Sequence, residues 1–151
     1  MKQFATVDDI LDFAINAEQE AVDFYTGWAD RTKNEKMKAV FIEFAAEEMK
    51  HKSRLIGIKE NHSFEMKEEK VKDLKISDFL VDVVASSTMT YADALVLAMK
   101  KEKNAFRLYM MLSSVADDPK MKALFLSLAT EESKHKLRFE VEYDEFVLRE
   151  N

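Results

Sequence analysis

The chain of 151 residues contains one sequence pattern twice, and this duplication restricts its fold more than any other feature. Residues 6–54 align with residues 90–138 without a gap, and nineteen of the forty-nine aligned pairs are identical. The copies end in two closely similar phrases, FAAEEMKHKSR at 44–54 and LATEESKHKLR at 128–138. Identity of this density in one register indicates a duplicated structural unit rather than the shared composition of amphipathic helices.

Each copy predicts a helical hairpin, because two glycines and one proline leave the chain few helix breakers. Thr6 and Asp9 have the spacing of a capping box at the start of the first helix, and Thr90 and Asp93 repeat it. The residues suited to begin the second helix of each hairpin are Asn34, Asp118 and Pro119.

The predicted fold class is therefore all-α, a four-helix bundle made of two duplicated helical hairpins with a long crossover connection. We expect a single domain over residues 1–151, with hairpins at about 6–59 and 90–148 and the crossover at 60–89. The first half of the crossover is charged, which predicts exposure to solvent. The apolar residues of its second half, which we expect to pack along the bundle, are Ile76, Phe79, Leu80, Val83 and Val84.

Composition excludes several classes of function. The absence of cysteine excludes disulfides, thiolate metal sites and a cysteine nucleophile. The net charge of -6 disfavours nucleic acid and anionic membrane surfaces as partners. Neither an apolar run long enough to span a membrane nor an apolar leader is present, so we expect a cytoplasmic protein that does not bind membranes.

Each predicted helix has an apolar seam at the alternating three- and four-residue spacing of a packed bundle, and each seam is interrupted at its middle by acidic or histidine residues. No lysine or arginine occupies these seams. A buried carboxylate is costly unless it is paired or binds a metal, and two divalent cations would balance four carboxylates. The interrupting residues are Glu18, Glu48, His51, Glu102, Glu132 and His135.

The spacing of these residues suits a dinuclear metal site. In Glu48-x-x-His51 and its repeat, Glu132-x-x-His135, both side chains lie on one helix face, one turn apart. Dinuclear sites in helix bundles take such a pair from each of two helices and one Glu from each of the other two. We predict that all six residues are metal ligands and carry any catalysis. Glu48 and Glu132 are best placed to bridge the metals, with the glutamates of the other two helices, Glu18 and Glu102, more terminal.

Residues near the seams are predicted to have lesser roles. Tyr25 and Tyr109 lie two turns from the single glutamates. Each either orients a ligand carboxylate by a hydrogen bond from its hydroxyl or packs as a core aromatic. Oxygen and imidazole ligands suit iron or manganese and are also compatible with zinc. The residues expected to flank the site are Glu47 and Glu131, and those expected at the surface are Glu20 and His62.

At these motifs the chain resembles the rubrerythrin family of ferritin-like di-iron carboxylate proteins, over about residues 6–145. The matching residues are Glu18 seven before Tyr25, EMKH at 48–51, Glu102 seven before Tyr109, and ESKH at 132–135. The resemblance implies a ferritin-like four-helix bundle that binds two metal ions, with iron as the expected metal. It also implies an enzyme that reduces a small-molecule oxidant, either hydrogen peroxide or dioxygen. Such an activity belongs to the oxidative stress response.

The chain departs from rubrerythrins proper in two ways. It has no cysteine and so looks like the short form that lacks the rubredoxin domain, which implies an external electron donor such as a rubredoxin-like protein. Ala105 stands where those proteins carry a further ligand glutamate. A homodimer is compatible with this interpretation.

Two other functions stay open from sequence alone. The first is a ferritin-like protein that handles iron without turnover, for which a large oligomer would be expected. The second is a metal-stabilised structural bundle, whose redox behaviour would be unchanged with zinc in place of iron.

Overall fold

The computed structural model describes residues 3–81 and 85–150. Within these ranges the chain is helical, without a named strand, and Gln3 and Lys75 form an isolated antiparallel β-bridge. No described helix has the length and apolar character needed to cross a membrane. The elements in order are α1 (Val7–Arg31), α2 (Glu35–Glu60), α3 (Glu68–Asp73), the 3-10 helix η1 (Ile76–Asp78), α4 (Tyr91–Val115) and α5 (Pro119–Glu150).

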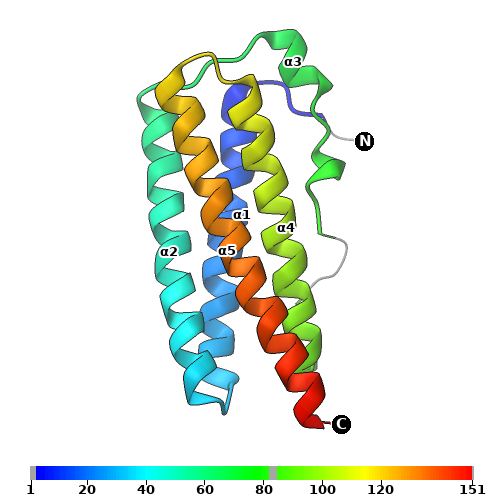
Figure 1. The fold of residues 1–151 in the computed structure, drawn as a ribbon. Helices are drawn as coiled ribbons and strands as arrows, with labels where there is room; N and C mark the ends of the chain where they lie inside the picture. The colour runs from blue at the N-terminus through cyan, green and yellow to red at the C-terminus, as the bar shows by residue number, and fades with distance from the viewer. Residues whose placement is uncertain (1–2, 82–84, 151) are drawn as a thin grey trace. The chain divides into compact units, whose positions relative to one another are not determined.

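The chain divides into two compact units, and each is built on one helical hairpin. In the first unit α1 packs against α2, and in the second α4 packs against α5 (Figure 1). The bounds of the four long helices agree with the two predicted hairpins. The prediction of a single domain over the whole chain stays a prediction.

The first hairpin begins each helix with the predicted cap. Thr6 Oγ1 accepts a hydrogen bond from the backbone N–H of Asp9 at 3.1 Å, and the Asp9 carboxylate accepts from the Thr6 N–H at 3.2 Å. This reciprocal pair satisfies two backbone donors that the first turn of a helix leaves without a partner. Asn34 caps α2 in the same way by accepting from the Met37 N–H at 3.2 Å.

The second hairpin repeats these signals in part. Thr90 Oγ1 accepts from the Asp93 N–H at 3.1 Å at the start of α4. Pro119 is the first residue of α5, where its missing N–H leaves no hydrogen bond unmade. The cap predicted for Asp118 stays a prediction.

The two hairpins also repeat their core packing. Tyr25 stacks on Phe41 with ring centroids 6.2 Å apart, and Tyr109 stacks on Phe125 at 6.5 Å. All four rings are buried. Since the second pair lies 84 positions after the first, the duplicated sequence produces the same contact in each unit.

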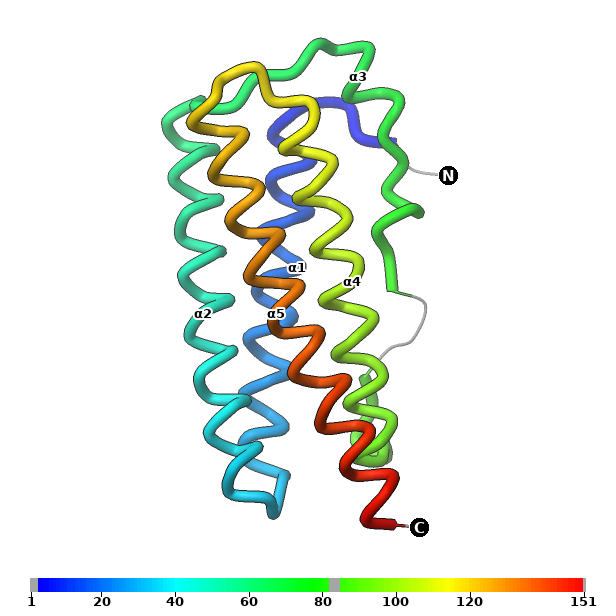
Figure 2. The backbone as a smooth tube through the Cα atoms, viewed as in Figure 1, coloured from blue at the N-terminus to red at the C-terminus, as the bar shows by residue number. Residues whose placement is uncertain are grey.

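The connection between the hairpins differs from its prediction. Figure 2 traces this connection through α3. The sequence analysis did not predict α3, because the segment is highly charged. Phe64 and Val71 are buried in the half expected to be solvated. Val71 is buried because even a short helix can turn one apolar residue inward, while Phe64 lies between α2 and α3. Leu80 is 53% exposed, so the prediction that it packs was wrong, while Ile76 and Phe79 are half-buried. Val83 and Val84 lie outside the described residues.

Candidate metal centre

The first hairpin holds a buried cluster of three residues, Glu18 on α1 with Glu48 and His51 on α2, which we call the first Glu–His cluster. Nδ1 of His51 lies 3.3 Å from Oε1 of Glu48 and 3.5 Å from Oε2 of Glu18. One ligand atom from each residue lies within 4.8 Å of the others, and no side chain of the three is more than 2% exposed. Two carboxylates and an imidazole at this separation form a donor set that a divalent metal ion accepts.

The second hairpin holds the equivalent second Glu–His cluster, formed by Glu102 on α4 with Glu132 and His135 on α5. Nδ1 of His135 lies 3.6 Å from Oε2 of Glu102 and 3.9 Å from Oε1 of Glu132. The three residues are at most 3% exposed. The structure thus brings together, within each unit, the three residues that the sequence analysis assigned to it. Their role as ligands stays a prediction.

The electrostatics of the first cluster favour a cation. Burial by itself lowers the pKa of His51, but the nearby carboxylates of Glu18 and Glu48 outweigh burial and raise this pKa to about 10. Without a metal ion, the imidazole therefore holds a proton as the counter-charge of the carboxylates. A metal ion that binds His51 must displace this proton, since the neutral imidazole is the ligand.

The tyrosines near the clusters are core residues by burial. Tyr25 is 0% and Tyr109 is 1% exposed, and each stacks on a phenylalanine of its own hairpin. The prediction that they orient ligand carboxylates stays open. Among the flanking residues, Glu47 and Glu131 are half-buried, whereas Glu20 and His62 are exposed as expected.

Comparison with protein families gives one match that covers most of the chain. The model of the family described as Rubrerythrin matches residues 9–85 and 93–151, and these ranges include both Glu–His clusters. The chain belongs to the rubrerythrin family. No curated protein sequence matches this family member significantly.

A solved structure supports the fold of this rubrerythrin-family chain. It is the crystal structure of a protein from Thermotoga maritima that is described as a ferritin-like diiron-carboxylate protein. The match has a TM-score of 0.76 at 20% sequence identity and covers 96% of this chain and 99% of the other. The predicted all-α, ferritin-like fold is therefore confirmed.

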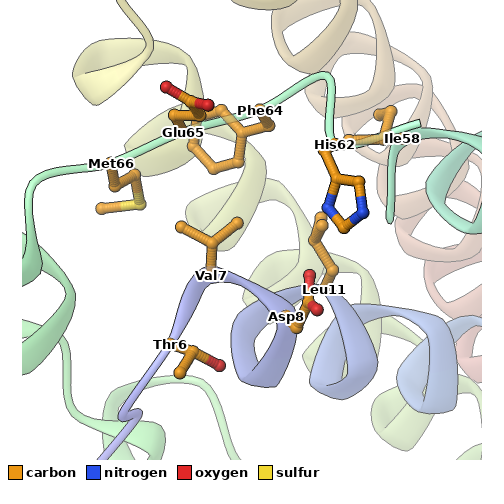
Figure 3. A pocket seen from close by; sticks show the side chains of 9 residues that line it. All are labelled: Thr6, Val7, Asp8, Leu11, Ile58, His62, Phe64, Glu65 and Met66. Carbon is orange, nitrogen blue, oxygen red and sulfur yellow. The ribbon is translucent and has the colours of Figure 1, made fainter. Parts of the chain in front are cut away.

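A pocket in the first unit does not contain the predicted ligands. It has a volume of about 330 Å³ and lies between the start of α1 and the segment after α2 (Figure 3). Val7, Leu11, Ile58 and Phe64 supply its apolar walls. Its polar side chains include Asp8 and His62, which belong to neither Glu–His cluster.

Sequence reasoning missed a fifth buried carboxylate among the described residues, Glu142 on α5, which is 2% exposed. Its Oε2 accepts hydrogen bonds from the Tyr91 hydroxyl at 2.9 Å and from Nη2 of Arg149 at 3.1 Å. The seam spacing contained the signal, because Glu142 is the next step after His135 and Phe139. Its counterpart in the first hairpin is Ile58, so the duplication gave no indication of a polar residue at this position.

Proposed function

We propose that this protein is a dinuclear-metal oxidoreductase that binds two iron ions and reduces hydrogen peroxide or dioxygen with electrons from a separate donor protein. The observation that carries the proposal is the pair of Glu–His clusters, one buried in each hairpin. Membership of the rubrerythrin family supports it, as does the description of the Thermotoga maritima protein as a diiron-carboxylate protein.

The donor set supports two metal ions rather than one. Each cluster offers two carboxylates and one imidazole, and three such donors can hold one metal ion with open positions left for other ligands. Glu48 and Glu132 would hold the metals together with the histidine one turn away on the same helix. Four carboxylates also balance the charge of two divalent cations, so that both histidines can bind as neutral ligands.

The protein would hold the metals and keep bulk water away from them. The chemistry that the metal pair supplies when bound is the donation of two electrons, one from each ferrous ion, to the oxidant. Reduction of one hydrogen peroxide to two waters also consumes two protons. Burial of both clusters keeps bulk water from the reacting atoms, which strengthens every electrostatic interaction there. We propose that a separate donor protein returns the two electrons, since this chain has no cysteine for a rubredoxin-type centre.

The first test is the metal content of protein purified without oxygen, with an optical spectrum before and after addition of peroxide. We expect two irons per chain and a ferric absorption band that appears with peroxide. Two zincs, or no metal and no spectral change, would contradict the proposal and favour a structural bundle. Iron uptake far beyond two per chain in a large oligomer would favour iron handling.

Variants of the clusters provide the second test. Glu48→Ala and His135→Ala should each lose bound iron and peroxide reduction together, because each removes a proposed ligand. Glu20→Ala is a matched control, since Glu20 is exposed on α1 two residues from Glu18. Peroxide reduction that persists in a variant shown to be free of metal would refute the assignment.

A further inference from the structure

The exposed face of α4 carries a stripe of positive charge, formed by Lys100, Lys103 and Arg107, which we call the basic stripe. All three side chains are exposed. Their spacing of three and four residues places them on one face of the helix. No acidic residue lies three or four positions from any of them, so the helix does not neutralise the stripe by pairs along its own surface.

The equivalent face of α1 has the opposite character. Asn16, Gln19 and Asp23 occupy the three positions that correspond to the basic stripe. Gln19 donates a hydrogen bond to Asp23 at 2.8 Å and accepts one from Lys52 at 2.6 Å, so these neutral and acidic side chains form a local network. The copies therefore keep the glutamate of their clusters and differ in charge where the helix faces solvent.

The basic stripe does not help α4 to fold. Lysines at positions i and i+3, and a lysine and an arginine at i and i+4, repel each other by about 0.2–0.5 kcal/mol per pair. The three residues lie in the middle of the helix, away from the C-terminal turn where cations interact favourably with the helix dipole. The repulsion within the stripe is therefore offset neither by acidic residues along α4 nor by the helix dipole, and a negatively charged partner would relieve it.

Apolar side chains are exposed beside the charges. Met110, which is 40% exposed, continues the same face one turn after Arg107. Asn104, between Lys103 and Arg107, donates a hydrogen bond from Nδ2 to the backbone carbonyl of Leu80 at 2.9 Å. This bond holds the connecting segment against α4 and places the exposed Leu80 near the basic stripe.

The stripe is close to the second Glu–His cluster. Lys103 follows Glu102 directly, and at 3.6 residues per turn the three cations are rotated by about 100–160° from it around the helix. Lys100 and Arg107 thus lie on the far side of α4 from a predicted ligand, and Lys103 lies on its flank. A helix with its side chains is about 10–12 Å thick, so a protein bound at the stripe would be separated from Glu102 by about this thickness.

We propose that the basic stripe, with Met110 and Leu80, is the docking surface for a small acidic electron-carrier protein. Positive charge steers an acidic protein to this face, and the exposed apolar side chains provide the short-range contact. A long polyanion such as RNA fits less well, because only a short stretch of this chain of net charge -6 would attract it. The inference rests on the proposed function, since electron delivery is what the docking would serve.

The test uses the full chain loaded with iron, and its probe is reduced rubredoxin. Rubredoxin is a small iron–sulfur protein rich in acidic residues. The variant Lys100→Glu, Lys103→Glu, Arg107→Glu reverses the stripe. The matched control is Lys36→Glu, Lys50→Glu, Arg54→Glu, which makes the same charge change at exposed positions of α2. Two quantities are measured, rubredoxin binding by calorimetry and the rate of rubredoxin oxidation in the presence of peroxide.

We expect reversal of the stripe to weaken binding and slow rubredoxin oxidation by about tenfold at low salt, because electrostatic steering changes association rates by factors of this order. The control variant should change both by less than about twofold. The difference between the variants should shrink as salt rises, since the Debye length falls from about 30 Å at 0.01 M to about 10 Å at 0.1 M. Equal effects of the two variants would overturn the proposal, and so would tight binding of a short RNA with no binding of rubredoxin.

The two proposals can fail separately. A single turnover of peroxide by protein that has been reduced beforehand and freed of excess reductant does not need a docking partner, so its rate should be the same in the wild type and both variants. Loss of this reaction in the wild type would refute the proposed function alone. Rubredoxin binding by calorimetry would still decide the docking surface, because binding does not require turnover.

Discussion

The hydroxyl of Tyr91 donates a hydrogen bond to Oε2 of Glu142 at 2.9 Å, and this contact links α4 to α5 within the second unit. The first hairpin has Val7 and Ile58 at the equivalent positions. Burial, together with the hydrogen bond to the Glu142 carboxylate, raises the pKa of Tyr91 well above its usual value. The phenol therefore keeps its proton and acts as a donor throughout the neutral range.

Removal of this donor should destabilise the protein. Tyr91→Phe leaves the buried carboxylate with one fewer partner, which we expect to lower the free energy of unfolding by about 1–2 kcal/mol. Urea denaturation of metal-free protein measures the change. Tyr143→Phe is the matched control on α5 and should have little effect. Equal stability of Tyr91→Phe and the wild type would show that the hydrogen bond contributes nothing net.

His62 adopts a left-handed backbone conformation, with φ of 51°, at the end of α2. The Ser63 N–H bonds to the Ile58 carbonyl at 3.1 Å and the His62 N–H to Lys59 at 3.3 Å, a pattern in which glycine is usual at this position. His62→Gly should therefore raise the free energy of unfolding by about 1 kcal/mol, because glycine adopts this conformation without a steric penalty.

Thermal unfolding monitored by circular dichroism measures this gain. His62→Ala is the control, because alanine keeps the β-carbon that makes the conformation unfavourable. A gain of the same size for alanine would mean that the imidazole, and not the backbone, is the source of the strain.

Gly57 lies within α2, and a β-carbon added there meets no atom within 4 Å. Gly57→Ala should stabilise the protein by about 0.5–1 kcal/mol, because alanine loses less backbone entropy in a helix. Gly27 in α1 has the same open surroundings, so Gly27→Ala serves as a second copy of the experiment. Chemical denaturation of both single variants and the double variant should give additive gains. A loss of stability in either single variant would contradict the prediction.

The raised pKa of His51 predicts how the stability of metal-free protein depends on pH. A pKa that rises on folding, here from 6.5 to about 10, adds stability that is complete below the unfolded value and is lost as pH increases through the folded one. The free energy of unfolding should therefore fall between about pH 7 and pH 10. His51→Gln removes the titrating group, so this fall should be shallower in the variant.

Urea titrations of both proteins at several pH values provide the measurement. The difference between them is the informative quantity, because groups far from His51 titrate equally in each. Parallel curves for the two proteins would show that His51 does not carry the proton. Iron or zinc should remove this fall in the wild type, since a bound metal replaces the proton on the imidazole.

Most of the fold and of the candidate site could be predicted from sequence because the signals are local or repeated. The Thr6–Asp9 capping box and the Asn34 cap depend on residues three positions apart, and both occur as predicted. The residues of each Glu–His cluster share their depth along regular helices, so helical spacing was enough to group Glu48 with His51. Pairing each of these with the glutamate of the preceding helix required only that the hairpin be antiparallel.

The features that could not be predicted depend on contacts between distant residues. Phe64 and Val71 lie in a segment whose charge suggested solvent, and the short α3 became evident only in the structure. Leu80 has the apolar side chain of a typical core residue and is nevertheless exposed. Glu142 lies on a predictable seam, but its partner Tyr91 is 51 positions earlier, and no local pattern indicates that the two meet.

The sequence by itself determined the two helical hairpins, their caps and the grouping of acidic and histidine residues on helix seams. This was possible because helical spacing and duplication are both visible in the order of residues along the chain. Only the tertiary structure decided the burial of each cluster, the raised pKa of His51 and the exposure of the basic stripe. These properties depend on which atoms of distant helices approach each other and which remain in water.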